Sequence, residues 1–148
     1  MFKHILFPTD GTELSRRAQD AALGLAKSLG ARVTAIHSIE PYTPQVTDLT
    51  FVYADPVPPE EYLAAARQAS AAILARFLAE AKEAGVACDA IDEVASAPWN
   101  AIVKAAEESH CDVIVMASHG RRGIAGVLLG SETQKVLTHS PVPVLVYR

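Results

Sequence analysis

The sequence has few cysteines and no histidine spacing of the kind that binds a metal. Cys88 and Cys111 are the two cysteines among 148 residues, and they lie far apart without forming a CxxC pair. A disulfide framework is therefore not expected, and both thiols are predicted to be free and buried. The five histidines show no HxxxH or HExxH spacing, so no protein-bound zinc site is predicted.

Long apolar runs and a surplus of positive charge are also missing. No apolar run approaches the roughly 18 residues of a membrane span, and the N-terminus reaches Pro8 and Asp10 without a signal-peptide pattern. Thirteen Lys and Arg against seventeen Asp and Glu give a formal net charge of −4. A non-specific nucleic-acid binder needs a broad basic face. We therefore expect a cytoplasmic protein that binds neither membranes nor nucleic acid.

The sequence does contain a regular alternation of short apolar runs with longer helical patterns. Such an alternation predicts an α/β fold with a parallel sheet. Because 148 residues, half of them hydrophobic, can bury a sizeable core, one domain spanning residues 1–148 is expected. One long irregular connection, from Pro41 to Pro59, contains five prolines. Strands are expected over residues 2–7, 32–39, 86–94, 112–117 and 143–147, and helices over residues 14–29, 60–84, 98–109 and 131–138.

The stretch from Ala117 to Ser131 is the strongest candidate for a binding site. It follows a predicted central strand, and ligands of open parallel sheets bind beyond the carboxyl ends of strands. It contains glycines at 120, 123, 126 and 130 and the adjacent Arg121 and Arg122. Gly130 and Ser131 open a predicted helix, whose free N–H groups favour an anion. The stretch therefore predicts a phosphate site.

A purely structural interpretation of the same stretch stays open. Ser131 followed three residues later by Gln134 resembles a capping box, in which the serine serves the helix. The glycines can be turn residues, and the two arginines can be solvated. His119, next to the loop, can contact a phosphate or pack within the loop.

No assembled catalytic constellation is evident. Asp10 and Glu13 are close in sequence, but Glu13 is expected in the first turn of a helix, where negative charge is favoured. Neither Ser118 nor Ser131 has the GxSxG context of a nucleophile elbow. Trp99 is expected in the core or at an interface.

The Ala117–Ser131 stretch resembles the nucleotide-binding branch of the universal stress protein family. The family pattern is Gly, two residues, Gly, nine residues, Gly, then Ser or Thr. Gly120, Gly130 and Ser131 match this pattern, and Ala117 replaces its first glycine. The resemblance extends along the chain through the segments ILFPTDGTE, AIHSIEP, DVIVMASHGRRG, LLGSETQKVL and SPVPVLVYR.

The resemblance implies a single-domain, Rossmann-like open sheet of five strands in the order 3-2-1-4-5, usually in a homodimer, with ATP as ligand, with or without Mg²⁺. By the same resemblance, Asp10 reaches the ribose hydroxyls, the Ser38 backbone faces the adenine, and Met116 lines the base and sugar. The residues expected around the nucleotide are Pro8, Thr9, Asp10, Ser38, Met116, Ala117, Gly120, Arg121, Gly130, Ser131, Glu132 and Thr133.

Three functions are compatible with these residues. The first is an ATP-binding regulatory protein of the stress response, acting as a nucleotide-responsive dimer. The second is a nucleotide-free dimeric interaction module, since Ala117 departs from the glycine pattern. The third is a slow ATPase. In that case Arg121 or Arg122 would supply positive charge at the γ-phosphate. Glu132 is the one carboxylate near the loop.

The last strand is the expected dimer interface. In the implied strand order, Val142–Tyr147 forms a sheet edge, and it is apolar without a charge before Arg148. An exposed edge of this kind is a template for another chain. The alternative is that a helix or the Pro41–Pro59 loop covers this edge within one chain.

Overall fold

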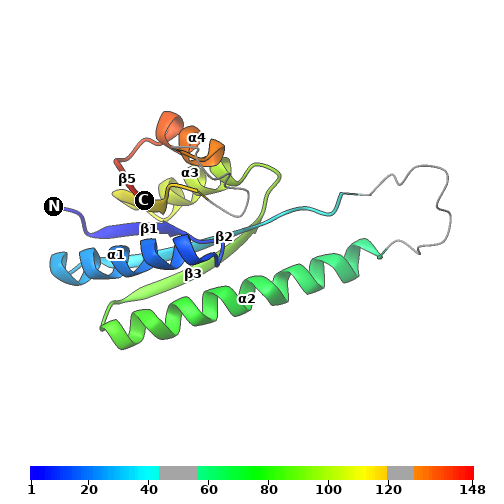
Figure 1. The fold of residues 1–148 in the computed structure, drawn as a ribbon, viewed down its shortest axis with the longest axis horizontal. Helices are drawn as coiled ribbons and strands as arrows, with labels where there is room; N and C mark the ends of the chain where they lie inside the picture. Colours follow the sequence, from blue (N-terminus) through cyan, green and yellow to red (C-terminus); the bar gives the residue numbers. More distant parts are fainter. Residues whose placement is uncertain (44–56, 120–128) are drawn as a thin grey trace.

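The computed structural model describes residues 1–43, 57–119 and 129–148. The strands in these ranges form one parallel sheet of five strands in the order β3-β2-β1-β4-β5 (Figure 1). The expected α/β fold and its strand order are therefore confirmed. The strands are β1 (His4–Pro8), β2 (Arg32–Ile39), β3 (Cys88–Val94), β4 (Val113–Ala117) and β5 (Val144–Tyr147).

The helices cover the two faces of the sheet. α1 (Glu13–Leu29) and α2 (Pro59–Ala84) pack on one face, and α3 (Pro98–Glu108) and α4 (Ser131–His139) pack on the other (Figure 1). Gly30 and Gly85 end α1 and α2 with φ angles of 61° and 74°. Glycine suits both positions because a side chain is strained in this left-handed region.

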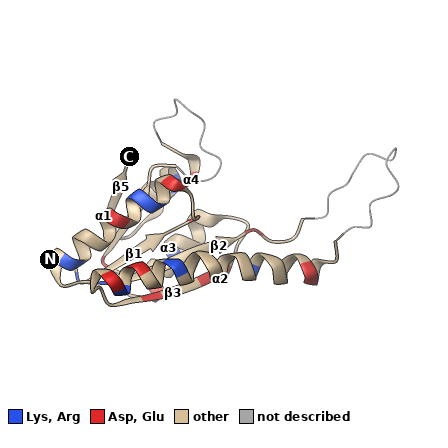
Figure 2. Cartoon of the chain, turned by 60° about the horizontal axis from the view of Figure 1, so that its bottom comes forward, with Lys and Arg blue, Asp and Glu red and all other residues tan. Residues whose placement is uncertain are grey.

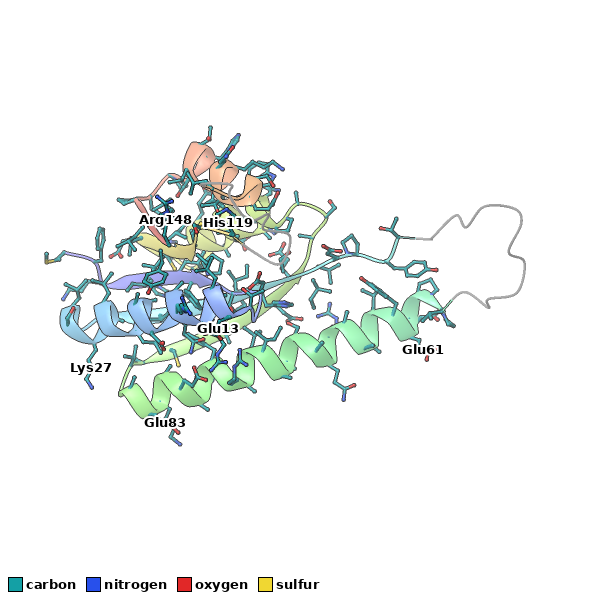
Figure 3. All side chains as sticks on the ribbon, viewed as in Figure 1. Glu13, Lys27, Glu61, Glu83, His119 and Arg148 are labelled. Carbon is teal, nitrogen blue, oxygen red and sulfur yellow. The ribbon has the colours of Figure 1, made fainter. Side chains whose placement is uncertain are left out.

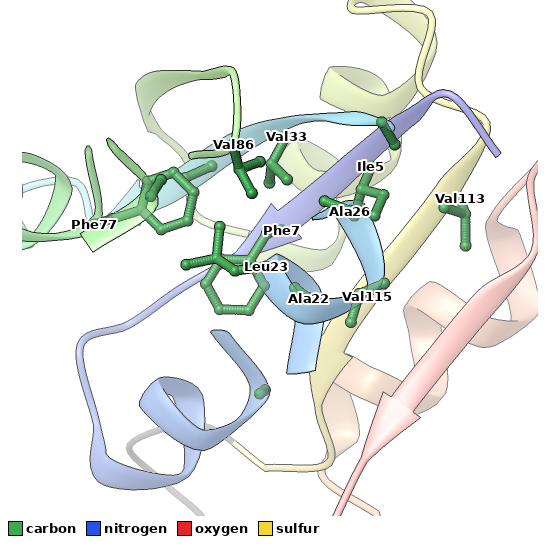
Figure 4. Close-up of a cluster of buried hydrophobic side chains, with 14 of the residues drawn as sticks. Ile5, Phe7, Ala22, Leu23, Ala26, Val33, Phe77, Val86, Val113 and Val115 are labelled. Atoms are coloured by element: carbon green, nitrogen blue, oxygen red, sulfur yellow. The ribbon is translucent and has the colours of Figure 1, made fainter. Parts of the chain in front are cut away.

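The alternation of side chains along β1 divides the core into two clusters. Ile5 and Phe7 point towards α1 and α2, whereas Leu6 points towards α3. Phe7 stacks on Phe77 of α2 with ring centroids 5.8 Å apart (Figure 4). Each such fully buried side chain contributes about 1.5–3 kcal/mol through removal from water. The two clusters fix the sheet between its helices and hold the strand ends in place.

The edge position of β3 explains why this strand carries three acidic residues. Asp89 forms an ion pair with Arg32, Asp92 with Arg67 at 3.0 Å, and Glu93 with Lys104 at 3.5 Å. These pairs are solvent-exposed, so each is worth about 0–1 kcal/mol. Charged side chains also protect a sheet edge from pairing with other chains.

Charges of both signs are interspersed on the helices. Lys and Arg residues alternate with Asp and Glu along α1 and α2 in the view of Figure 2. On α1, Glu13 pairs with Arg16 and Arg17, and on α2 Arg76 pairs with Glu80. Among the helices of the described residues, including the 26 residues of α2, none is long and apolar enough to cross a bilayer.

The two thiols are free, as expected. Cys111 is buried as expected, but the prediction of burial was wrong for Cys88, which is half-buried because it lies on the edge strand β3. Burial raises the pKa of the Cys111 thiol to about 11, and the neighbouring Asp112 carboxylate adds to this rise. Burial also raises the pKa of Cys88.

Candidate functional site

A cavity of about 710 Å³ opens at the carboxyl ends of β1, β2 and β4. The chain runs outwards from β1 through β2 to β3 and then returns to the other side of β1 as β4. The cavity therefore lies at the point where the strand order reverses, which is where parallel α/β sheets bind ligands. The starts of α3 and α4 and the first half of α2 complete its walls.

The structure brings ten of the twelve predicted site residues together around this cavity. Gly120 and Arg121 lie outside the described residues. The predicted residues that line the cavity are Pro8, Thr9, Asp10, Ser38, Met116, Ala117, Gly130, Ser131, Glu132 and Thr133. Further lining residues that the sequence did not indicate include His37, Tyr62, Ala66, Ala69, Pro98 and Ile102.

The turn after β1 holds Asp10 in a fixed orientation. Its Oδ1 atom accepts hydrogen bonds from the Thr12 backbone N–H at 3.0 Å and from the Thr12 hydroxyl at 2.7 Å. Thr12 in turn caps α1 by accepting the Ser15 N–H. Below them, the buried Thr9 hydroxyl lies 2.9 Å from the Ser15 hydroxyl. This network fixes the Asp10 carboxylate at the cavity wall.

The turn also needs glycine at position 11. Gly11 has a φ of +75°, and a Cβ added there would lie 3.1 Å from the Ile73 side chain. The tight packing between this turn and α2 sets the distance between two walls of the cavity.

Gly130 allows α4 to begin close to the end of β4. Its N–H donates to the Ser118 carbonyl at 2.8 Å, and a Cβ added to Gly130 would lie 3.2 Å from that oxygen. Its φ is −65°, so the glycine is needed for close approach and not for a left-handed conformation. Ala117, at the end of β4, is likewise not among the described residues with positive φ, so alanine is unstrained where the family pattern has glycine.

The capping-box interpretation of Ser131 is wrong. Gly130 occupies the N-cap position without a side-chain cap, and Ser131 is the first helical residue. The Gln134 amide donates to the Leu129 carbonyl at 3.2 Å. The sequence misassigned the cap because the helix begins one residue earlier than an N-cap at Ser131 would need. Ser131 is exposed and lines the cavity.

The next two side chains of α4 hold the helix in place. The buried Thr133 hydroxyl donates to the Ser118 carbonyl at 3.1 Å. The Glu132 carboxylate accepts the Trp99 backbone N–H at 2.8 Å and the Lys135 ammonium at 3.0 Å. Of these three residues, Ser131 is therefore the one whose side chain is not used to hold the helix. The first backbone N–H groups of the helix also have no intrahelical acceptors.

His119 lies between the end of β4 and the start of α4 (Figure 3). Its Nδ1 atom is 3.0 Å from the Ser118 hydroxyl. Its Nε2 atom is buried and has no hydrogen-bond partner within the described residues. His119 packs against Gly130, which agrees with the loop-packing interpretation, and it also lines the cavity.

Comparison with known proteins agrees with this fold and cavity. The sequence model of the Universal stress protein family matches residues 1–148. This chain belongs to that family. A universal stress protein of Thermus aquaticus, described as lying in the QAH/OAS sulfhydrylase 3′ region, is 31% identical over 148 residues and covers the whole of both chains. The expected family membership is thereby confirmed.

Solved structures of universal stress proteins share the architecture of this family member. Protein MJ0577 of Methanocaldococcus jannaschii superposes with a TM-score of 0.82 at 27% identity, covering 99% of this chain and 95% of MJ0577. A universal stress protein in complex with cAMP superposes with a TM-score of 0.72 at 28% identity, covering 99% and 97%. Both similarities extend over nearly the full length of each chain.

Proposed function

We propose that this universal stress protein binds an adenine nucleotide, with ATP as the principal ligand, in the cavity at the switch point of its sheet. The observation that carries the proposal is the start of α4. Gly130, Ser131 and the first N–H groups of the helix line the same cavity as the fixed carboxylate of Asp10. A helix N-terminus attracts phosphate, and a carboxylate accepts hydrogen bonds from ribose hydroxyls.

In this proposal the two ends of the cavity bind the two ends of the nucleotide. The phosphates contact Gly130 and Ser131, with Gly120 and Arg121 as the further expected contacts from the neighbouring stretch. Asp10 accepts the ribose hydroxyls, and the base lies among Ser38, Met116 and Ala117. Mg²⁺, where it accompanies ATP, is held mainly through the phosphate oxygens.

The cAMP complex supports the ligand class. That protein is 28% identical to this chain and has the same fold over nearly its full length. An adenine nucleotide is therefore the first ligand to test. ATP itself is favoured by the resemblance of Gly120, Gly130 and Ser131 to the family's nucleotide-binding pattern.

We also propose that the protein is a homodimer paired through β5. This strand is the edge next to β4, and its Leu145 side chain is 43% exposed. Val144 and Val146 are half-buried and point towards the α3 and α4 side. Antiparallel pairing of two β5 strands would satisfy their free backbone groups and cover Leu145. A nucleotide-dependent change in this dimer would make the protein a regulator of the stress response in the cytoplasm.

Nucleotide content tests the proposal directly. Protein purified without added ligand is denatured, and the supernatant is analysed by ion-exchange chromatography for ATP, ADP, AMP and cAMP. We expect a bound adenine nucleotide, or ATP binding by calorimetry if the purified protein is empty. An empty protein that also binds no adenine nucleotide would instead support a nucleotide-free interaction module.

A turnover assay separates binding from catalysis. Glu132, the carboxylate nearest the phosphate end, already accepts hydrogen bonds on both oxygens. It is therefore poorly placed to act as a base for an attacking water. We expect radiolabelled ATP to be hydrolysed no faster than in buffer. Turnover that falls in Arg121→Ala or Arg122→Ala would establish the ATPase alternative.

A further inference from the structure

The first part of α2 contacts the rest of the fold through Tyr62 and through the exposed ion pair of Arg67 with Asp92. Residues 59–69 of α2 contain no buried residue, and the helix extends well beyond the end of the sheet (Figure 1). The Tyr62 hydroxyl donates to the Glu40 carbonyl at 3.2 Å. The Tyr62 ring also meets the Tyr42 ring edge-on, with centroids 5.5 Å apart and planes at 62°. Both tyrosines are half-buried.

Tyr62 lines the nucleotide cavity and stands at the far end of its α2 wall. The near end is fixed by Ser70, whose buried hydroxyl lies 2.9 Å from Nδ1 of His37 on β2. Ala66 and Ala69 line the cavity between Ser70 and Tyr62. The rise of an α-helix places Tyr62 about 12 Å beyond Ser70 along the axis. The wall therefore consists of small side chains that end at an aromatic ring.

Among the described residues, the ring of Tyr62 retains a surface on the cavity side. Its hydroxyl is bound to the backbone at Glu40, which follows the end of β2 and is two residues beyond Ser38. An edge-to-face contact with Tyr42 occupies at most one face of the ring. A base held against the Ser38 backbone would therefore lie beside the cavity wall that Tyr62 closes.

We propose that Tyr62 is the aromatic wall of the base subsite and stacks on the nucleobase. This inference rests on the nucleotide binding proposed above. Stacking on an aromatic side chain is available to any base, because every base has a π-face. Tyr62 therefore contributes affinity for the base, while the hydrogen bonds at Ser38 contribute the preference for adenine. The hydroxyl of Tyr62 acts as an anchor to Glu40 and not as a ligand contact.

Calorimetric titrations of four proteins with AMP and with ribose 5-phosphate test this assignment. The proteins are wild type, Tyr62→Ala, Tyr62→Phe and Leu63→Ala. Leu63 is the matched control because it neighbours Tyr62 on α2 and does not line the cavity. Absorbance near the adenine band supplies a second readout, since stacking lowers the absorbance of the bound base. Ribose 5-phosphate, which has no base, is measured by competition with AMP.

We expect Tyr62→Ala to weaken AMP binding about tenfold or more and to abolish the absorbance decrease. Tyr62→Phe keeps the ring and should stay within about threefold of wild type, as should Leu63→Ala. Ribose 5-phosphate should bind all four proteins equally. Wild-type AMP affinity in Tyr62→Ala overturns the inference and leaves the proposed function intact. An equal loss for AMP and ribose 5-phosphate overturns it too, because Tyr62 would then act through the fold. A wild-type protein that binds no adenine nucleotide overturns the proposed function itself.

Discussion

Glu132 caps a helix other than its own. Its Oε2 atom accepts the Trp99 backbone N–H at 2.8 Å, although Glu132 lies on α4 and Trp99 on α3. α3 needs this contact because its N-cap, Ala97, has no side-chain acceptor and Pro98 has no N–H. The starts of α3 and α4 both line the cavity. The Glu132 carboxylate therefore fixes the relative position of two of its walls.

We predict that Glu132→Ala destabilises the fold by about 1–2 kcal/mol, the typical cost of losing a charged acceptor at a helix start. Chemical unfolding measures this change. The emission of Trp99, the single tryptophan of the chain, should shift in the folded state as its surroundings loosen. Glu132→Gln keeps an acceptor oxygen and should lose less. Lys135→Ala is the control for the exposed ion pair with Glu132 and should stay within about 0.5 kcal/mol of wild type. Equal stability of Glu132→Ala and wild type would show that the cap contributes nothing.

Gly130→Val should abolish or strongly weaken nucleotide binding while leaving the sheet intact. An added Cβ would lie 3.2 Å from the Ser118 carbonyl, so the start of α4 must shift away from the end of β4. The branched side chain would also occupy the approach of the phosphates. Calorimetry with ATP measures the loss, and far-ultraviolet circular dichroism checks the fold.

Gly24→Val is the matched control for the phosphate end. Gly24 lies within α1, where a Cβ would meet nothing within 4 Å. This variant should bind ATP as wild type does. If Gly130→Val also binds ATP with wild-type affinity, the phosphates lie elsewhere.

Substitutions in β5 should convert the proposed dimer to a monomer. Leu145→Lys places a charge on the exposed edge, and Val144→Pro removes a backbone donor from it. Light scattering at tens of micromolar protein should report a dimer for wild type and a monomer for both variants. Leu137→Lys, on α4 and equally exposed at 43%, tests whether the interface extends beyond the strand. A monomeric wild type would contradict the dimer. If both β5 variants remain dimeric, the interface lies outside β5.

Stability should fall between about pH 9 and pH 11 because of Cys111. Burial raises the pKa of this thiol from 9.0 to about 11. Between these values the unfolded chain has released the thiol proton and the folded chain retains it, so raising the pH favours unfolding. Thermal unfolding of wild type and Cys111→Ala across this range measures the difference in slope. Identical slopes would assign the pH dependence to other groups.

The order of helices and strands was predictable because the sequence marks both their faces and their ends. Strand β2 matches the expected residues 32–39, and Gly30 and Gly85 end the helices where the pattern placed them. These features depend on local periodicity and on the conformational freedom of glycine. The starts of β1 and β3 differ from the expected ones because pairing between strands decides where a strand begins. β1 begins at His4 and not at residue 2, and β3 begins at Cys88 and not at residue 86.

The candidate site was predictable along the strand ends and not along α2. Asp10 follows β1 closely, and Gly130 ends the connection from β4 to α4, so their convergence at one edge follows from the parallel sheet. Tyr62 and His37 both line the cavity because α2 packs beside β2, although the two residues are more than twenty positions apart in the sequence. The Ala-rich sequence of α2 does not specify which of its faces meets the sheet. The capping of α3 by Glu132 depends in the same way on contacts between distant elements.

The exposed start of α2 also has a consequence for kinetics. In the proposed binding mode the base lies against residues 59–69, none of which is buried, whereas the phosphates lie near the end of the wholly buried strand β4. Segments with few buried contacts open locally at low free-energy cost, and buried strands open near the cost of global unfolding. A nucleotide would therefore leave with its base first, by transient fraying of one helix. The residence time would be set by α2 and the phosphate affinity by α4, so mutation could change one without the other.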